Sequence, residues 1–361
     1  MVVKGLILPG GCPQTERQPS EAWARGPLAS VANRPVIAHV LDELHGAGVR
    51  EALLALPDGE GGELDARFAA ELRACVEAKC PPGLTLGYLP FATPDGLQRG
   101  LAEAAALIGE AACLVHAADG LLAQPLAPLA ALLRESSPDL VALVHPTPAG
   151  AGSIGLATRR LLRLAGSREG GAVELAGVCL LGPGALRHVG GAGWCRDRAL
   201  DLVPIAERLA AAGGELRVER IRGWRRAGGS TQDLLELNRI ALDALCPTEA
   251  PPGEGNRVEG NVEVHPTACV QSSTIVGPAI VGADALVLDS YIGPYTSIGA
   301  GARIEGAEVE RSIVLQGASI THIGGRLVGS LVGREARIFR DFSLPRALRV
   351  TVGDGNEVAL C

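Results

Sequence analysis

The chain has 361 residues, of which 47% are hydrophobic and 3% aromatic, and its formal net charge is −7. This length allows two domains with a sizeable core each, and the hydrophobic content excludes an intrinsically disordered protein. The negative charge argues against a nucleic-acid partner, which would require a basic face on the protein.

Nine cysteines are scattered from Cys12 to Cys361 without a CxxC pair. This pattern is typical of reduced thiols, and it favours neither a disulfide framework nor a zinc site. No charged and apolar leader precedes the first expected strand, and no apolar run is long enough to span a bilayer. We therefore expect a soluble cytoplasmic protein without a membrane partner.

Residues 2–245 alternate short apolar strands with amphipathic helices. The expected strands are 3–8, 52–56, 84–89, 112–117, 139–144 and 174–182, and the expected helices are 35–45, 65–78, 97–107, 125–135, 202–212 and 230–244. This alternation predicts an α/β domain with a mostly parallel sheet that helices cover on both faces. Ligands of such sheets bind beyond the carboxyl ends of the strands, where the Gly10–Gly11 turn and Asp119 fall.

A Pro/Gly-rich segment interrupts this pattern at 246–256, and a short repeat follows it. Aliphatic residues recur about every six positions, at Val258, Val264, Val270 and Val276, at Val281 and Val287, and at Ile292, Ile298 and Ile304. Such a hexapeptide repeat predicts a left-handed parallel β-helix, whereas a β-sandwich would alternate with period two. The predicted domains are an α/β domain over 1–245, a linker over 246–256, and a β-helix with a C-terminal tail over 257–361.

The first expected strand runs into a glycine turn, Leu6-Ile7-Leu8-Pro9-Gly10-Gly11, and a polar loop then leads to a helix that opens at Pro35. Together with the β-helix tail, this start resembles the sugar-1-phosphate nucleotidyltransferases, and most closely the long glucose-1-phosphate thymidylyltransferases. The resemblance implies a Rossmann-like nucleotidyltransferase domain. It also implies a reaction in which a nucleoside triphosphate and a sugar 1-phosphate form a nucleotide sugar and pyrophosphate.

Positions that shape the family's pocket are largely kept. The resemblance assigns nucleotide binding to Gly10, Gly11, Phe91, Pro94 and Gly96, sugar binding to Gly155, Gly177 and Val178, and the first metal-binding aspartate to Asp119. A nucleotide or nucleotide-sugar ligand is therefore expected.

Positions that carry charge in the family are mostly replaced. The catalytic lysine falls on Gly26, the second metal aspartate on Ala227, and the Glu-Lys pair for the sugar phosphate on Gly166 and Ser167. Arg17 and Arg25 are the candidate cations that would stand in for the loop's arginine and lysine. A single carboxylate holds Mg²⁺ poorly, so Mg²⁺ as a cofactor is in question.

Structural roles compete with functional ones at several residues. Asp119 is as well suited to capping a turn as to binding a metal. We expect His116 to be a hydrogen-bonded core histidine. The arginines from Arg217 to Arg226 form either a solvated face or, through Arg225 or Arg226, a contact to phosphate in place of a metal.

Three functions follow from these observations. The first is a catalytically inactive family member with a binding, regulatory or structural role in sugar-nucleotide metabolism, beside an active paralogue or another protein partner. The second is an active enzyme with rebuilt phosphate contacts at Arg17, Arg25 and Arg225. The third is a β-helix acyltransferase, which would need a histidine as its base. His265 and His322 lie in or near the repeat but in no catalytic pattern, and we expect them at coil corners, so this function ranks last. The flat faces of a β-helix also predict a homo-oligomer.

Overall fold

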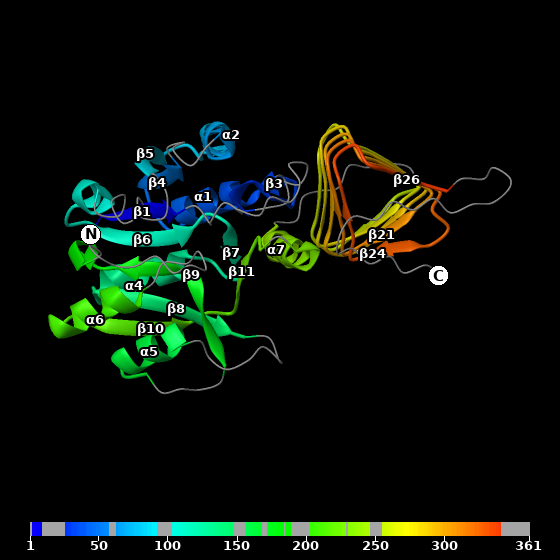
Figure 1. The fold of residues 1–361 in the computed structure, drawn as a ribbon. Coiled ribbons are helices and arrows are strands. Elements are labelled where there is room, and N and C mark those ends of the chain that lie inside the picture. The colour runs from blue at the N-terminus through cyan, green and yellow to red at the C-terminus, as the bar shows by residue number, and fades with distance from the viewer. Residues whose placement is uncertain are drawn as a thin grey trace.

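The computed structural model describes residues 2–8, 26–57, 63–91, 103–147, 156–167, 172–183, 185–188, 202–228, 230–245 and 255–340. It consists of an α/β part and a three-sided β-helix, with helix α7 (Thr231–Asp243) lying between them (Figure 1). Among the described residues, no helix is long and apolar enough to span a membrane.

A seven-stranded sheet in the order β10-β8-β9-β6-β1-β4-β5 forms the centre of the α/β part. Its strands are β1 (Val3–Leu8), β4 (Glu51–Pro57), β5 (Thr85–Phe91), β6 (Ala112–Ala117), β8 (Leu140–Pro146), β9 (Val173–Leu181) and β10 (Leu216–Arg220). All neighbours pair in parallel except at β9, which is antiparallel to both β6 and β8. The mostly parallel sheet is as predicted, and β10 is a strand that the sequence pattern did not reveal.

Helices cover the two faces of this sheet, as the alternating pattern predicts. They are α1 (Val36–Gly46), α2 (Glu63–Lys79), α4 (Ala127–Glu135), α5 (Leu156–Leu164), α6 (Val203–Ala211) and α7. Helix α5 was not predicted, and of the predicted helix 97–107 only 103–107 are described, as part of a helical stretch that reaches 108. One hydrophobic cluster joins α1, α4 and α7 to one face, and a second joins α6 to the other.

Short elements connect these layers. They are the 3-10 helices η2 (Gly26–Leu28) and η3 (Ala185–His188), the hairpin of β2 (Ser30–Val31) and β3 (Arg34–Pro35), and the ribbon of β7 (Gly120–Leu122) with β11 (Trp224–Arg226). The ribbon positions the residues of the candidate site.

The C-terminal part is a left-handed parallel β-helix made of three five-stranded sheets. Its strands are β12 (Arg257–Glu259), β13 (Val262–Val264), β14 (Cys269–Gln271), β15 (Thr274–Val276), β16 (Ala279–Val281), β17 (Leu286–Leu288), β18 (Tyr291–Ile292), β19 (Thr296–Ile298), β20 (Arg303–Glu305), β21 (Glu308–Glu310), β22 (Ile313–Val314), β23 (Ser319–Thr321), β24 (Arg326–Val328), β25 (Leu331–Val332) and β26 (Arg337–Phe339). Val264, Val270, Val281, Val287, Ile292, Ile298 and Ile304 all lie in its hydrophobic core, as the repeat predicts.

One predicted core position of the β-helix is wrong. Ile275 is fully buried in the core, whereas Val276 is half-buried and lies outside the core cluster. The cause is the length of each coil: Val270 pairs with Val287 and Ile275 with Ile292, so a coil holds one residue fewer than three full hexads. A strict spacing of six residues therefore predicts Val276 as the core residue of this strand, where the structure has Ile275.

The β-helix packs directly on the α/β part. Ile280, Ile313 and Leu315 of the β-helix belong to the same hydrophobic cluster as α1 and α7. At its centre Asn238 of α7 is fully buried, and its Oδ1 accepts hydrogen bonds from Ala32 N at 2.8 Å and Ser297 Oγ at 2.6 Å. Its Nδ2 donates to Tyr295 O at 3.1 Å, so one side chain joins hairpin, helix and β-helix.

Candidate functional site

Asp119 lies at the carboxyl end of β6, between that strand and β7. The ribbon of β7 and β11 holds it there, because Gly120 pairs with Arg226 and Ala227 N donates to Asp119 O at 2.7 Å. Position 227 is therefore directly beside position 119. This is the arrangement that the resemblance requires of two metal-binding aspartates, although an alanine occupies the second position.

Arg226 occupies both oxygens of the Asp119 carboxylate. Its Nε lies 3.2 Å from Oδ1 and 3.2 Å from Oδ2, and its Nη2 lies 2.6 Å from Oδ2. Asp119 is 4% exposed, whereas the Arg226 side chain is 29% exposed. The pair is thus a charge-assisted, forked contact between a buried carboxylate and an arginine whose side chain is partly exposed.

Trp224 fixes the ribbon against the sheet. A Cβ at Gly120 would lie 2.3 Å from its Cζ2 atom, and one at Gly177 would lie 2.5 Å from the same atom. The ring also contacts His116 edge-on, with centroids 5.5 Å apart. Glycine is required at 120 and 177 because the indole occupies the space of a side chain at both positions.

His116 is the core histidine that the sequence predicts. It is fully buried, its Nδ1 lies 2.8 Å from Ala117 O, and its Nε2 lies 3.3 Å from a Glu43 carboxylate oxygen. With Trp224 against its ring, it supports the ribbon that positions Asp119.

Gly26, to which the resemblance assigns the family's lysine, begins η2 with a φ of +64°. It is buried, and a Cβ built on it would meet no atom within 4 Å. Space is therefore available for a side chain, but the backbone conformation is one that only glycine adopts readily. A lysine here would require the start of η2 to change its conformation.

Gly166 and Ser167, to which the resemblance assigns the family's Glu-Lys pair, lie at the C-terminal end of α5. Gly166 has a φ of +62°, and Ser167 N donates to Leu162 O at 2.9 Å, so the two residues close the helix. Neither residue offers a charge to a sugar phosphate.

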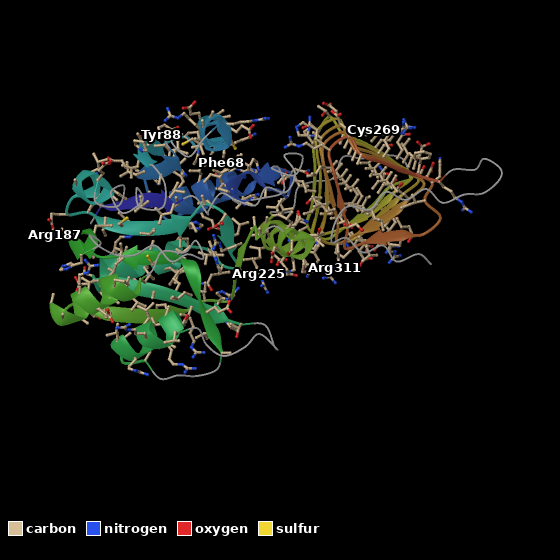
Figure 2. All side chains as sticks on the ribbon, viewed as in Figure 1. Phe68, Tyr88, Arg187, Arg225, Cys269 and Arg311 are labelled. Atoms are coloured by element: carbon tan, nitrogen blue, oxygen red, sulfur yellow. The ribbon has the colours of Figure 1, made fainter. Side chains whose placement is uncertain are left out.

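Arg225 adds a positive charge near the carboxyl end of β8. It lies on β11 (Figure 2), and its charge acts on His145, whose Nδ1 lies 3.1 Å from Pro146 O. Burial lowers the pKa of His145, and Arg225 lowers it further against the opposing effects of the Pro146 carbonyl and Glu174. His145 is therefore neutral at pH 7, so Arg225 carries the positive charge of this pair.

Several predicted site residues lie outside the described residues. These are Gly10, Gly11, Arg17, Arg25, Pro94, Gly96 and Gly155, and the side chain of Phe91 at the end of β5 also falls outside them. Val178 pairs with His116 across β9 and β6 and is 1% exposed in the core. The ligand roles of all these residues stay predictions.

Comparison with known proteins finds relatives that align with almost the whole chain. No family model matches it. A glucose-1-phosphate thymidylyltransferase of Streptomyces antibioticus is 29% identical over 99% of both chains, and one of Streptomyces griseus is 29% identical over 98% of both. A low-salt glycan biosynthesis nucleotidyltransferase of Haloferax volcanii is 24% identical over 99% of this chain and all of its own length. Over almost its whole length the chain is therefore similar to proteins named glucose-1-phosphate thymidylyltransferase.

A solved Bacillus anthracis structure, described as a putative glucose-1-phosphate thymidylyltransferase in complex with sucrose, also aligns with the chain. It matches 68% of this chain and 98% of its own at 14% identity and a TM-score of 0.48.

The two positions that the resemblance assigns to Mg²⁺ binding, Asp119 and Ala227, do not suit the ion. Both oxygens of Asp119 bind Arg226, and Ala227 supplies no ligand atom. No group of three His, Cys, Asp or Glu side chains that could hold a metal occurs in the described part of the chain. Mg²⁺ prefers an octahedral set of oxygen ligands, so the donor set here does not fit the ion.

The candidate site contains two structural features that could not be read from the sequence. The pairing of Arg226 with Asp119 and the packing of Trp224 on two glycines both depend on the register of β7 with β11. The only sequence signal was the arginine that directly precedes the lost aspartate. The two histidines of the acyltransferase alternative, His265 and His322, each directly follow a strand, at corners of the β-helix.

Proposed function

We propose that this nucleotidyltransferase-family protein no longer catalyses nucleotidyl transfer and acts as a binding, regulatory or structural subunit in sugar-nucleotide metabolism. The observation that carries the proposal is Gly26, because its left-handed backbone disfavours the lysine of the family at that position. In this proposal the ligand is a nucleotide or a nucleotide sugar, the protein is a homo-oligomer, and an active paralogue or other protein is its partner.

The chemistry explains why these losses matter together. Nucleotidyl transfer brings two polyanions into contact, so its rate depends on positioned positive charges. A single positioned cation contributes a factor on the order of 10³ or more in phosphoryl-transfer enzymes. Gly26, Gly166 and Ser167 are neutral, so they supply none of the charges that the family has at these positions. Asp119 is paired with Arg226 and is almost fully buried. Loss of several such charges would leave little measurable turnover.

A pyrophosphate-release assay tests the proposal directly. The full chain is incubated with Mg²⁺, glucose 1-phosphate and each of dTTP, UTP, ATP, CTP and GTP, with the Streptomyces antibioticus relative as the positive control. We expect no release above the protein-free rate. Release that the Asp119→Ala variant abolishes would refute the proposal and identify an active enzyme.

The second candidate is an active sugar-1-phosphate nucleotidyltransferase. The full-length similarity to two proteins named glucose-1-phosphate thymidylyltransferase favours it. In that case Arg17, Arg25 and Arg225 would provide the phosphate contacts, and the Arg225→Gln variant would raise the KM for sugar phosphate.

A further inference from the structure

We infer that the guanidinium of Arg226 takes the place of the divalent metal at this site, so that the site binds anionic ligands without a metal ion. The identity of the anionic ligand rests on the proposed function, whereas the pairing of Arg226 with Asp119 does not. It differs from the family pattern, in which two aspartates hold the ion.

Geometry supports this role for Arg226. A magnesium ion would need to approach the Asp119 oxygens to about 2.0–2.1 Å. The Arg226 nitrogens are already 2.6 and 3.2 Å from those oxygens, and with the carboxylate 4% exposed little of its surface is open to another approach. An ion could bind only after Arg226 moved away.

Charge supports it as well. The formal charges of two aspartates and a divalent cation sum to zero, and so do those of one aspartate and one arginine. The replacement of the second aspartate by Ala227 and the pairing of Asp119 with Arg226 therefore leave the net charge of the set unchanged. Loss of the metal without Arg226 would leave Asp119 buried and unpaired, which is strongly destabilising.

The surroundings hold the arginine in place. Ribbon β7–β11 sets Gly120 opposite Arg226, and Trp224 packs the ribbon against β6 and β9. Because the guanidinium is part of the chain, its charge is present at any metal concentration. The Arg226 side chain is 29% exposed and lies on β11, beside Asp119 at the carboxyl end of β6.

Manganese binding by the intact chain, read from the loss of the free Mn²⁺ signal in electron paramagnetic resonance, tests the inference. We expect wild type and Asp119→Asn to bind Mn²⁺ equally weakly. The Arg226→Met/Ala227→Asp variant restores two unpaired aspartates, and we expect it to bind Mn²⁺ at least tenfold more tightly. Its matched control, Arg225→Met/Ala227→Asp, loses the neighbouring arginine and should stay at the wild-type level.

Two results would overturn the inference. One is Mn²⁺ binding by wild type that falls tenfold in Asp119→Asn, and the other is a folded Arg226→Met/Ala227→Asp variant that gains nothing. If that variant lacks the wild-type circular dichroism spectrum, Arg226→Gln/Ala227→Asp is measured instead, with the same expected gain. Pyrophosphate release by wild type in EDTA would refute the loss of catalysis while leaving the role of Arg226 intact, so the two failures are distinguishable.

Discussion

Gly26 illustrates how one backbone angle affects the chemistry of the site. Its φ of +64° lies in the left-handed region, while its surroundings leave room for a side chain. The obstacle to a side chain here is therefore the backbone conformation at the start of η2, because a Cβ itself meets no neighbouring atom within 4 Å. A Gly26→Lys substitution alone would strain η2, so a lysine at this position would require further substitutions that change the backbone.

Substitution of Gly26 by alanine measures this constraint. An L-residue in the left-handed conformation costs roughly 1–2 kcal/mol, so Gly26→Ala should lower the free energy of unfolding by about that amount. The matched control is Gly46→Ala, in the last residue of α1, where a Cβ also meets nothing within 4 Å and φ is not positive. That variant should be neutral or more stable by up to about 1 kcal/mol. Equal effects of the two substitutions in urea denaturation would contradict the assignment of strain to position 26.

Helix α7 connects the α/β part to the β-helix. Ser230 caps its N-terminus by accepting from Asp233 N at 3.1 Å, and its buried face includes Leu234 and Leu237. Asn238 on the same face bonds to the turn between β2 and β3 and to β19. That turn follows η2 closely, so the β-helix supports the segment next to the position of the family's lysine.

Asn238→Leu is predicted to be among the most destabilising single substitutions. It leaves the Ala32 amide, the Ser297 hydroxyl and the Tyr295 carbonyl without their partner. Because each buried unpaired polar group costs about 1–3 kcal/mol, the loss in unfolding free energy should be about 3 kcal/mol or more. Ser297→Ala removes one donor of the same network and should cost about 1 kcal/mol. A loss in Asn238→Leu no larger than that in Ser297→Ala would show that the network does not hold the two parts together.

For the whole molecule, the fold was predictable from the sequence to a greater extent than the site. Strand 3–8 and the buried face of α1 follow directly from periodicity, and the aliphatic repeat predicts the β-helix core except at Ile275. The pairing of Asp119 with Arg226 joins residues 107 positions apart, and it depends on a two-stranded ribbon too short to leave a periodic signal. Side-chain contacts of this kind require the register of the strands.

The full-length similarity and the altered charges together describe a molecule with the architecture of a nucleotidyltransferase and a different electrostatic site. In the proposed function, Arg226 provides the positive charge that a metal would bring, and Gly26 marks the lost catalytic cation. We therefore expect the protein to retain ligand binding and to lack turnover.

Calorimetric titration of the full chain with dTDP-glucose, in Mg²⁺ and again in EDTA, tests this separation of binding from turnover most directly. We predict binding with the same affinity in both buffers, because the charge of Arg226 does not depend on the metal. Binding that requires Mg²⁺ would contradict the replacement of the ion by Arg226. If neither dTDP-glucose nor UDP-glucose binds in either buffer, the result would contradict the proposal that the protein retains ligand binding.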